Sequence, residues 1–294
     1  MRGIFICSTF TPMLRFPNCK INLGLSVTHK REDGYHALDT VFYPLPLCDV
    51  LEFIESDEMI FESSGLDIPG DANDNIILRA YRLLKHDFPS IPNLHIHLHK
   101  NIPTGGGLGG GSSDAAFMLM MMDECFNLSH SPSSATLLPL TPYALSLGSD
   151  CPFFLYNTPC HALGRGELLT PINVDLSAYC FVLILPSIHI PTPWAFTQLT
   201  PAPPPKSTKD IIRRPIETWK DILKNDFEEG IFKAYPLLKK IKEDLYHAGA
   251  VYASMSGSGS TMFGIIDKIR LEDVKKKIDE EKLFEGLGVY YVQG

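Results

Sequence analysis

Alternating apolar and polar positions predict two strands near the start of the chain. They cover residues 21–28 and 41–44, and Arg31-Glu32-Asp33-Gly34 between them supplies a tight reversal at Asp-Gly. Residues 73–85 repeat their apolar positions at the spacing of one helix face, and residues 94–99 alternate again as a strand. The first third of the chain therefore predicts a hairpin followed by a helix and a strand.

The second half shows a different succession of elements. After an apolar strand at 180–185, the patterns predict helix, strand, strand, helix and strand at 227–248, 251–254, 261–266, 271–282 and 289–292. This order is that of a ferredoxin-like domain. The charges of the last helix predict a solvated face. Residues 186–205 contain seven prolines, which excludes regular helix or a central strand there and favours a surface loop that can contact a ligand.

Composition narrows the class of protein. The chain has 294 residues, 45% hydrophobic and 20% charged, so it can form two domains with packed cores and is not disordered over most of its length. The 26 basic residues against 34 acidic ones leave a net charge of −8. No global basic field can hold nucleic acid or an anionic membrane, so an anionic ligand must be captured by local groups.

The seven cysteines are scattered and contain no C-x-x-C pair, which predicts reduced thiols and a cytoplasmic location. The apolar run at residues 3–7 is too short for a signal peptide. No stretch approaches the roughly 20 apolar residues that span a bilayer. We therefore expect a protein without nucleic-acid or membrane partners, acting as a monomer or a weak homodimer.

A glycine-rich loop is the strongest chemical signal in the chain. Six glycines stand within the seven positions 105–111, after the strand at 94–99 and before a Met-rich apolar helix at 114–123. Glycine carries an entropic cost, so such a run indicates a backbone that another group approaches closely. Loop amides and a helix N-terminus capped by Ser112 or Ser113 would form a cradle for phosphate. The alternative is a flexible linker.

The common nucleotide-binding signatures do not fit this loop. Gly105, Gly107 and Gly110 satisfy G-x-G-x-x-G, and Asp123 follows at a suitable distance. That aspartate ends a predicted helix instead of a second strand, so a dinucleotide fold is disfavoured. No Gly-Lys-Ser or Gly-Lys-Thr closes the loop as in a P-loop, and the protein-kinase H-R-D and D-F-G signatures are missing.

Two further short segments add to the constellation. Lys20 and Asn22 share one face of an otherwise apolar strand, where a lysine is costly unless its charge is used. Residues 254–261 form a second small-residue loop between two predicted strands. Taken singly, a lysine that extends to solvent and a plain hairpin turn are the better explanations of these segments.

A row of histidines offers a competing site. His95, His97 and His99 alternate on one strand face, a geometry that can bind zinc. No clear fourth ligand accompanies them. A solvated sheet face is the simpler interpretation.

Three motifs together resemble those of the GHMP small-molecule kinases, named for galactokinase, homoserine kinase, mevalonate kinase and phosphomevalonate kinase. They are Lys20-Ile21-Asn22-Leu23, the glycine loop at 105–113 and residues 255–261. Residues 31–36, 148–154, 164–167 and 190–193 resemble the branch of this family that acts on a cytidine diphosphate conjugate of methylerythritol. The resemblance spans residues 17–266 in order, and its departures, at Asn18, Cys19 and Cys151, leave the expected catalytic residues intact.

The resemblance implies an α+β fold with two domains. An N-terminal ribosomal-protein-S5-like nucleotide domain would cover residues 1–160 and carry the ATP loop and the catalytic residues. A C-terminal ferredoxin-like domain would cover residues 161–294 and contribute to the substrate site. The implied activity is phosphorylation of the 2-hydroxyl of the cytidine diphosphate conjugate, on the non-mevalonate route to isoprenoids, with ATP as co-substrate and Mg²⁺.

The resemblance also assigns roles to residues. Asp150 would be the general base at the acceptor hydroxyl, with Lys20 beside it. From its place before Pro152, Asp150 could equally be a helix cap. ATP would contact Asn75, Lys100, Pro103, Thr104, Gly105, Gly106, Gly107, Leu108, Gly109, Gly110, Gly111, Ser112 and Ser113. The cytidine diphosphate substrate would contact Asn22, Tyr35, His36, Thr192 and Phe196.

Some roles stay open at this level. Arg165 could meet the substrate diphosphate or be a solvated surface arginine, and the resemblance assigns no ligand to Mg²⁺. Another GHMP kinase, for a sugar, homoserine or mevalonate, is the first alternative function. A nucleotide-binding regulator without catalysis is the second. The aromatic residues at 35–36 argue against the former, and the presence of both Lys20 and Asp150 argues against the latter.

Overall fold

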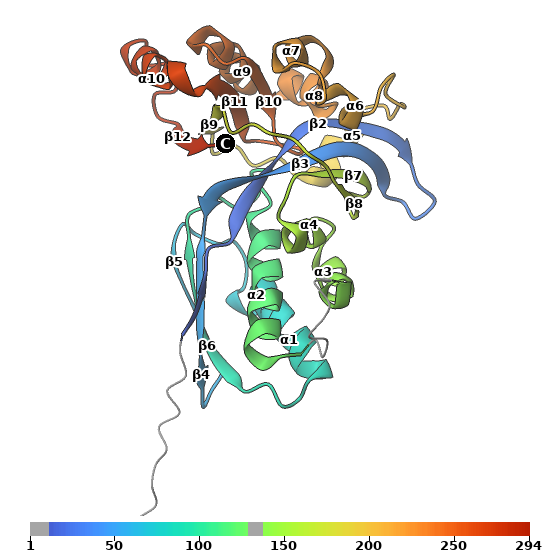
Figure 1. Ribbon diagram of the computed structural model, residues 1–294, viewed down its shortest axis with the longest axis vertical. Helices are drawn as coiled ribbons and strands as arrows, with labels where there is room; N and C mark the ends of the chain where they lie inside the picture. The colour runs from blue at the N-terminus through green and yellow to red at the C-terminus, as the bar shows by residue number, and fades with distance from the viewer. Residues whose placement is uncertain (1–11, 129–137) are drawn as a thin grey trace, which may run out of the picture.

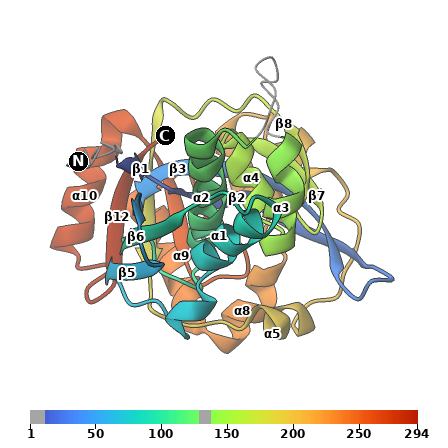
Figure 2. The same cartoon turned by 90° about the horizontal axis from the view of Figure 1, so that it is seen from below.

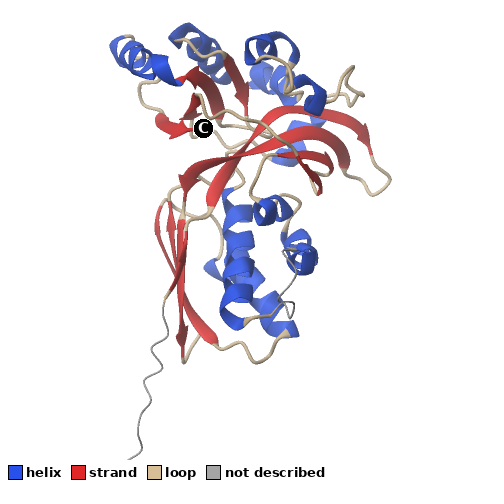
Figure 3. Ribbon diagram, in the orientation of Figure 1, coloured by secondary structure: helices blue, strands red, loops and turns tan. Residues whose placement is uncertain are grey.

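The computed structural model describes residues 12–128 and 138–294, and the elements below are given for those residues. The prediction for residues 3–7 falls outside the described part of the chain. Helices surround three four-stranded sheets, as Figure 3 shows in blue and red. The fold is α+β, as predicted.

The first sheet lies in the lower half of the molecule, where two of the helices pack against it (Figure 1). Its strand order is β1 (Met13–Arg15), β4 (Val50–Ser56), β6 (Asn93–Lys100) and β5 (Ile60–Gly65). One face packs against α1 (Ile76–Asp87) and α2 (Gly110–Phe126), which lie side by side in Figure 2 as well. Alternation in β6 turns its leucines and isoleucine into this core and its histidines outward, as the period-two pattern predicts.

The second sheet connects the two halves of the molecule. It is antiparallel, in the order β2 (Asn18–Lys30), β3 (His36–Cys48), β7 (Cys160–Gly164) and β8 (Leu168–Pro171). The β2–β3 hairpin reverses at residues 31–34, as predicted, but both strands are far longer than their sequence patterns indicated. In β2 the apolar side chains of Cys19, Ile21 and Leu23 pack in the core shared with the C-terminal sheet, and the polar side chains of Lys20 and Asn22 lie on the opposite face, so the alternation persists although both faces are buried.

The third sheet confirms the ferredoxin-like prediction for the C-terminal half. Its order is β10 (Tyr252–Met255), β11 (Met262–Asp267), β9 (Tyr179–Leu185) and β12 (Gly288–Gln293), all antiparallel. The helices α8 (Phe227–Ala234), α9 (Pro236–Ala248) and α10 (Leu271–Glu280) lie above it in Figure 1. The remaining helices are η1 (Ala72–Asp74), η2 (Leu138–Leu140), α3 (Thr141–Leu147), α4 (Cys151–Tyr156), α5 (Thr192–Thr197), α6 (Thr208–Ile211), η3 (Ile216–Thr218), α7 (Trp219–Ile222) and η4 (Lys268–Arg270).

Proline explains where the helix predictions were wrong. The single helix expected at 227–248 is two helices, α8 and α9, because Pro236 cannot continue α8 and instead opens α9. The proline-rich segment was expected to contain no helix, yet α5 forms there with Pro193 in its first turn. In a first turn the missing amide costs no hydrogen bond. The same holds for Pro142 in the first turn of α3.

Two further predictions concern the boundary between the domains and the oxidation state of the cysteines. A boundary at 160/161 stays a prediction, and we note that β7 starts at Cys160 and pairs with β3. The described cysteines are free, consistent with the expected reduced thiols, and Cys7 lies outside the described residues. Among the described residues, no helix is both long and apolar enough to cross a membrane.

Candidate active site

The three motifs found in the sequence meet at one place in the fold. The amide of Thr261 donates to the carbonyl of Gly106 (3.1 Å), and the Ser256 hydroxyl donates to the carbonyl of Gly107 (2.8 Å). On the other side of the glycine loop, the amide of Lys20 donates to the carbonyl of Leu108 (2.9 Å). The loop therefore lies between β2 and the loop that joins β10 to β11.

Close approach of the protein's own atoms accounts for two of the glycines. Gly107 has φ +79°, and a methyl group on it would lie 2.2 Å from the carbonyl oxygen of Ser256. Gly109 has φ +71°, and a methyl group there would lie 3.1 Å from Cγ of Lys20. Both glycines are thus required by packing as well as by backbone conformation. From the sequence alone, the close approach that these glycines permit was attributed to a bound phosphate and not to atoms of the protein.

The start of α2 is open to an anion. We expected Ser112 or Ser113 to cap this helix, but the cap position is Gly109, and no side chain of the described residues caps it. The left-handed conformation of Gly109 starts the helix one turn earlier than predicted, so the serines lie inside the first turn. The first amides of the 17-residue helix lack intrahelical acceptors, and its dipole favours negative charge there.

Lys20 and Asp150 form the ionic centre of the site. The Lys20 ammonium lies 3.4 Å from a carboxylate oxygen of Asp150, donates to the side-chain oxygen of Asn22 (2.8 Å) and lies over the ring of Phe42. Asp150 occupies the N-cap position of α4, as the helix-cap alternative expected, but its side chain accepts no capping hydrogen bond from the described residues, so the carboxylate is not engaged as a cap. The lysine side chain is 5% exposed and the aspartate 33%, which directs the carboxylate toward the opening.

A hairpin after α4 forms the rim next to this pair. Gly166, with φ +106°, lies so close that a methyl group on it would be 3.5 Å from a carboxylate oxygen of Asp150. Its neighbour Arg165 stacks its guanidinium over the ring of Tyr35 (4.7 Å to the centroid). Arg165 is therefore fixed against one of the predicted substrate residues and is not a freely solvated arginine.

Aromatic side chains from both halves of the chain stack on one another next to the turn of the β2–β3 hairpin. The rings of His36 and Phe196 are parallel within 8°, with centroids 4.5 Å apart, and Phe227 meets Phe196 edge-on. Burial lowers the pKa of His36, which favours a neutral ring. Thr192, at the start of α5, hydrogen-bonds Ser258 (3.2 Å) and so ties α5 to the loop behind the glycine loop. The arrangement offers a flat, uncharged surface beside a cation.

Comparison with known proteins identifies the family. The models for the GHMP kinases N terminal domain and the GHMP kinases C terminal domain match residues 75–158 and 207–283. A 4-diphosphocytidyl-2-C-methyl-D-erythritol kinase of Bacteroides fragilis is 45% identical over 92% of this chain and 97% of its own. The chain belongs to the 4-diphosphocytidyl-2-C-methyl-D-erythritol kinase family, a branch of the GHMP kinases. The corresponding kinase of Azobacteroides pseudotrichonymphae is 47% identical over 87% of this chain and 94% of its own.

Solved structures agree with this assignment. A crystal structure of 4-(cytidine 5'-diphospho)-2C-methyl-D-erythritol kinase superposes with a TM-score of 0.77 at 29% identity, covering 96% of this chain and all of that one. The mevalonate kinase of Methanococcus jannaschii reaches 0.67 at 14% identity, covering 96% and 98% of the two chains, which shows a shared fold alone. The two-domain GHMP kinase fold expected from the motifs is thus confirmed.

In this member of the kinase family, two of the predicted ATP contacts, Lys100 and Asn75, have partners within the protein itself. The Lys100 ammonium is buried between the carboxylates of Asp49 and Asp114, 2.8 Å from the latter. Asp49 also accepts the amides of Asn101 (2.6 Å) and Ile102 (2.8 Å), where the loop begins. Burial raises the pKa of Asp114 to about 7. Asn75 uses its side-chain oxygen to cap α1, accepting from the amide of Ile77 (2.9 Å).

Sequence reasoning missed the residues that hold these loops. The side-chain amide of Asn225 donates to the carbonyls of Met255 and Gly257 (2.8 Å each), and its oxygen accepts from the amide of Phe227 (3.0 Å). Asp49 and Asp114 have the corresponding role for the glycine loop. The partners of these three residues are distant in sequence, so no local pattern predicts their role. For Asp49 and Asp114, an acidic residue beside an apolar run was a possible signal of a buried charge that needs a partner.

The histidine row does not form a metal centre in the described part of the chain. His95 pairs with Glu62 (3.0 Å), and Ser64 bonds both His97 (3.0 Å) and His99 (2.9 Å). A search of residues 12–128 and 138–294 finds no group of three His, Cys, Asp or Glu side chains placed to hold a metal ion. The structure favours the solvated sheet face over the zinc site.

Proposed function

We propose that the protein transfers the terminal phosphoryl group of ATP to the 2-hydroxyl of 4-diphosphocytidyl-2-C-methyl-D-erythritol. The observation that carries the proposal is the ion pair of Lys20 and Asp150, which come from two different motifs and lie beside the glycine loop, where Lys20 contacts Gly109. The names of the relatives supply the acceptor. The chemistry requires an anion cradle, a cation and a group at the acceptor hydroxyl, and the site offers each of them.

In the proposed reaction the glycine loop and the first amides of α2 bind the ATP phosphates. The Asp150 carboxylate accepts a hydrogen bond from the acceptor hydroxyl and takes its proton as the new P–O bond forms. The bond from the terminal phosphorus to the bridging oxygen breaks, and its electrons leave with ADP. Lys20, held by Asn22 and by the ring of Phe42, keeps Asp150 oriented and lies next to the reacting hydroxyl.

We assign substrate binding to the aromatic side chains of Tyr35, His36 and Phe196. His36 and Phe196 already present parallel faces, to which a cytosine ring can add by stacking. Arg165, over Tyr35, supplies a cation for the diphosphate. This assignment explains why a small-molecule kinase carries a stack of rings beside its phosphate loop.

Mg²⁺ fits the same loop. Kinases bind it through substrate phosphates together with one or two protein oxygens. The Ser113 hydroxyl is buried in the first turn of α2 without a hydrogen-bond partner among the described residues, so it has an oxygen available as a ligand. Bound there with ATP, the ion would neutralise phosphate charge. The free cysteines support action in a reducing, cytoplasmic compartment.

The test is ATP turnover with Mg²⁺ by the purified protein, given the cytidylated methylerythritol, mevalonate, homoserine or galactose separately. We expect turnover with the first alone, and a loss of about 10²-fold or more in Asp150→Asn with binding of an ATP analogue retained. The exposed Asp67→Asn is the matched control and should keep full activity. Turnover with another acceptor would instead support a different GHMP kinase. ATP binding without turnover on any acceptor would support a regulator.

A further inference from the structure

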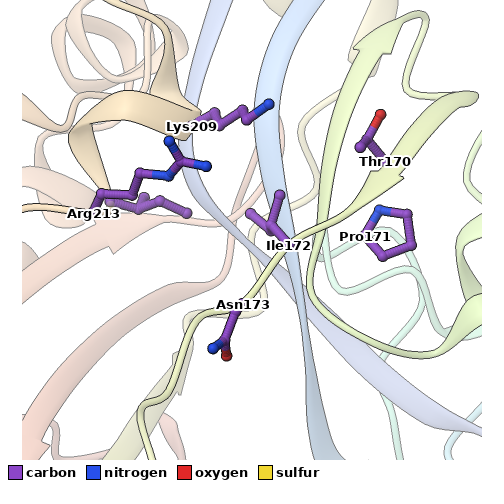
Figure 4. Close-up of a pocket in the computed structure, with 7 residues that line it drawn as sticks. Thr170, Pro171, Ile172, Asn173, Lys209 and Arg213 are labelled. Carbon is purple, nitrogen blue, oxygen red and sulfur yellow. The ribbon is translucent and has the colours of Figure 1, made fainter.

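A second pocket lies on the outer side of the β2–β3–β7–β8 sheet, apart from the kinase site. It has a volume of about 290 Å³ and lies between the end of β8 with the residues that follow it and the segment that contains α6. Figure 4 shows Lys209 and Arg213 on one side and Thr170, Ile172 and Asn173 on the other. None of these residues belongs to the three kinase motifs.

The charge of this pocket is opposite to that of the protein as a whole. The chain carries a net charge of −8, yet both charged residues that line the pocket are cations. Neither Lys209 nor Arg213 has an acidic partner within 4.0 Å among the described residues, whereas many other surface lysines form ion pairs. Lys209 lies in α6 and Arg213 in the turn that follows it, and both line the same small pocket, where their like charges repel. An anion between them would remove that repulsion.

The pocket is held in place before any ligand arrives. Thr208, next to Lys209, donates its amide (3.2 Å) and its hydroxyl to the carboxylate of Asp39 on β3. Asp39 also bonds the ring of His161 on β7 (3.0 Å). On the facing wall, the amide of Ile172 donates to the carbonyl of Pro159 (2.9 Å). Because the backbone on both walls is already fixed, only the two cationic side chains need to be ordered when an anion binds, which limits the conformational entropy lost.

The lining also indicates the class of ligand. A guanidinium and an ammonium together suit phosphate oxygens, and the Thr170 hydroxyl and the Asn173 amide add neutral donors. Ile172 and the buried Ile212 provide a small apolar surface. The volume lies at the lower end of the range for small-molecule sites. We propose that this pocket is a second ligand site, which binds a small phosphate- or diphosphate-bearing metabolite through Lys209 and Arg213.

The proposal is tested by calorimetric titration of inorganic phosphate and pyrophosphate into the full-length protein, with the kinase site filled by a non-hydrolysable ATP analogue. We expect saturable binding of pyrophosphate at one equivalent, weakened at least tenfold in the double variant Lys209→Gln/Arg213→Gln. The control Lys239→Gln/Lys276→Gln removes the same charge from two exposed lysines on α9 and α10 and should bind as the unaltered protein does.

Three results would overturn the proposal: no saturable binding of either anion, binding that survives the loss of both pocket cations, or an equal loss in the control variant, which would indicate a nonspecific charge effect. The measurement needs no turnover, so it stands or falls independently of the proposed kinase activity. Both pocket cations lie at the surface of the fold, and thermal denaturation of the double variant verifies that it remains folded.

Discussion

Substitution of Gly107 by alanine tests whether the contact between the two loops builds the kinase site. The new methyl group would lie 2.2 Å from the Ser256 carbonyl oxygen, so that carbonyl must move by roughly 1.2 Å to reach the 3.4 Å of ordinary contact. The hydrogen bonds from Ser256 to Gly107 and from Thr261 to Gly106 span the same contact. At about 1 kcal/mol each, their loss lowers the free energy of unfolding by about 2 kcal/mol.

The substitution should also lower the catalytic activity. A displacement of about 1 Å in a positioned group can cost about 100-fold in rate, so we expect a loss of that order in kcat/KM for Gly107→Ala. Gly286→Ala is the matched control, since Gly286 has the same φ of +79° and no atom within 4 Å of the added methyl group. Both variants carry the same backbone strain, of about 1–2 kcal/mol. Only the first carries the clash.

The assay is steady-state turnover of both variants well below their melting temperatures, together with denaturant unfolding. We expect Gly286→Ala to stay within about threefold of the unaltered activity, because its strain is remote from the site. If Gly107→Ala is as active and as stable as Gly286→Ala, the contact between the loops does not position the phosphate cradle, and the reasoning fails.

Three other outcomes follow from the site. Lys100→Met leaves the buried carboxylates of Asp49 and Asp114 without their cation and should lower the free energy of unfolding by about 3–5 kcal/mol in denaturant; a loss under about 1 kcal/mol would contradict this. Because the pKa of Asp114 rises from 3.8 to about 7 on folding, the folded chain binds more protons, so this residue's contribution to stability falls as pH increases from 4 to 7. Unfolding measured across that range should show a shallower fall in Asp114→Asn, and identical slopes would exclude the effect. Phe196→Ala removes the ring stacked on His36 and should raise KM for the cytidylated acceptor about tenfold in turnover assays, with Phe196→Leu as the control that keeps an apolar side chain but no ring; an equal rise in KM for ATP would place the ring elsewhere.

Most of the elements that local signals in the sequence predicted are present, but the strands β1, β4, β5, β7 and β8 were not predicted. The Asp33-Gly34 reversal, the alternation of β6 and the order of elements in the C-terminal half need only neighbours along the chain. The errors have local causes as well. Pro236 divides one predicted helix in two, and Pro193 sits in the first turn of α5, where proline does no harm.

The roles of single polar residues were harder to predict. Lys100 was expected at the nucleotide, but a sequence does not show that Asp49 and Asp114 surround its ammonium in the core. Asn225 carried no recognisable signal, because its two carbonyl partners belong to a loop some thirty residues further on. A buried polar group is decided by its partners, and those partners are brought together by folding.

The sequence alone determined the types of group available and their immediate setting: a run of glycines before a helix, a lysine in an apolar strand, an aspartate before a short helix. These follow from backbone preference and from the cost of burying charge, which act over a few residues. Only the tertiary structure decided that Lys20 and Asp150 lie 3.4 Å apart and that the glycine loop rests on the loop between β10 and β11. Such contacts join segments more than a hundred residues apart, and they exist only once the three sheets have packed against one another.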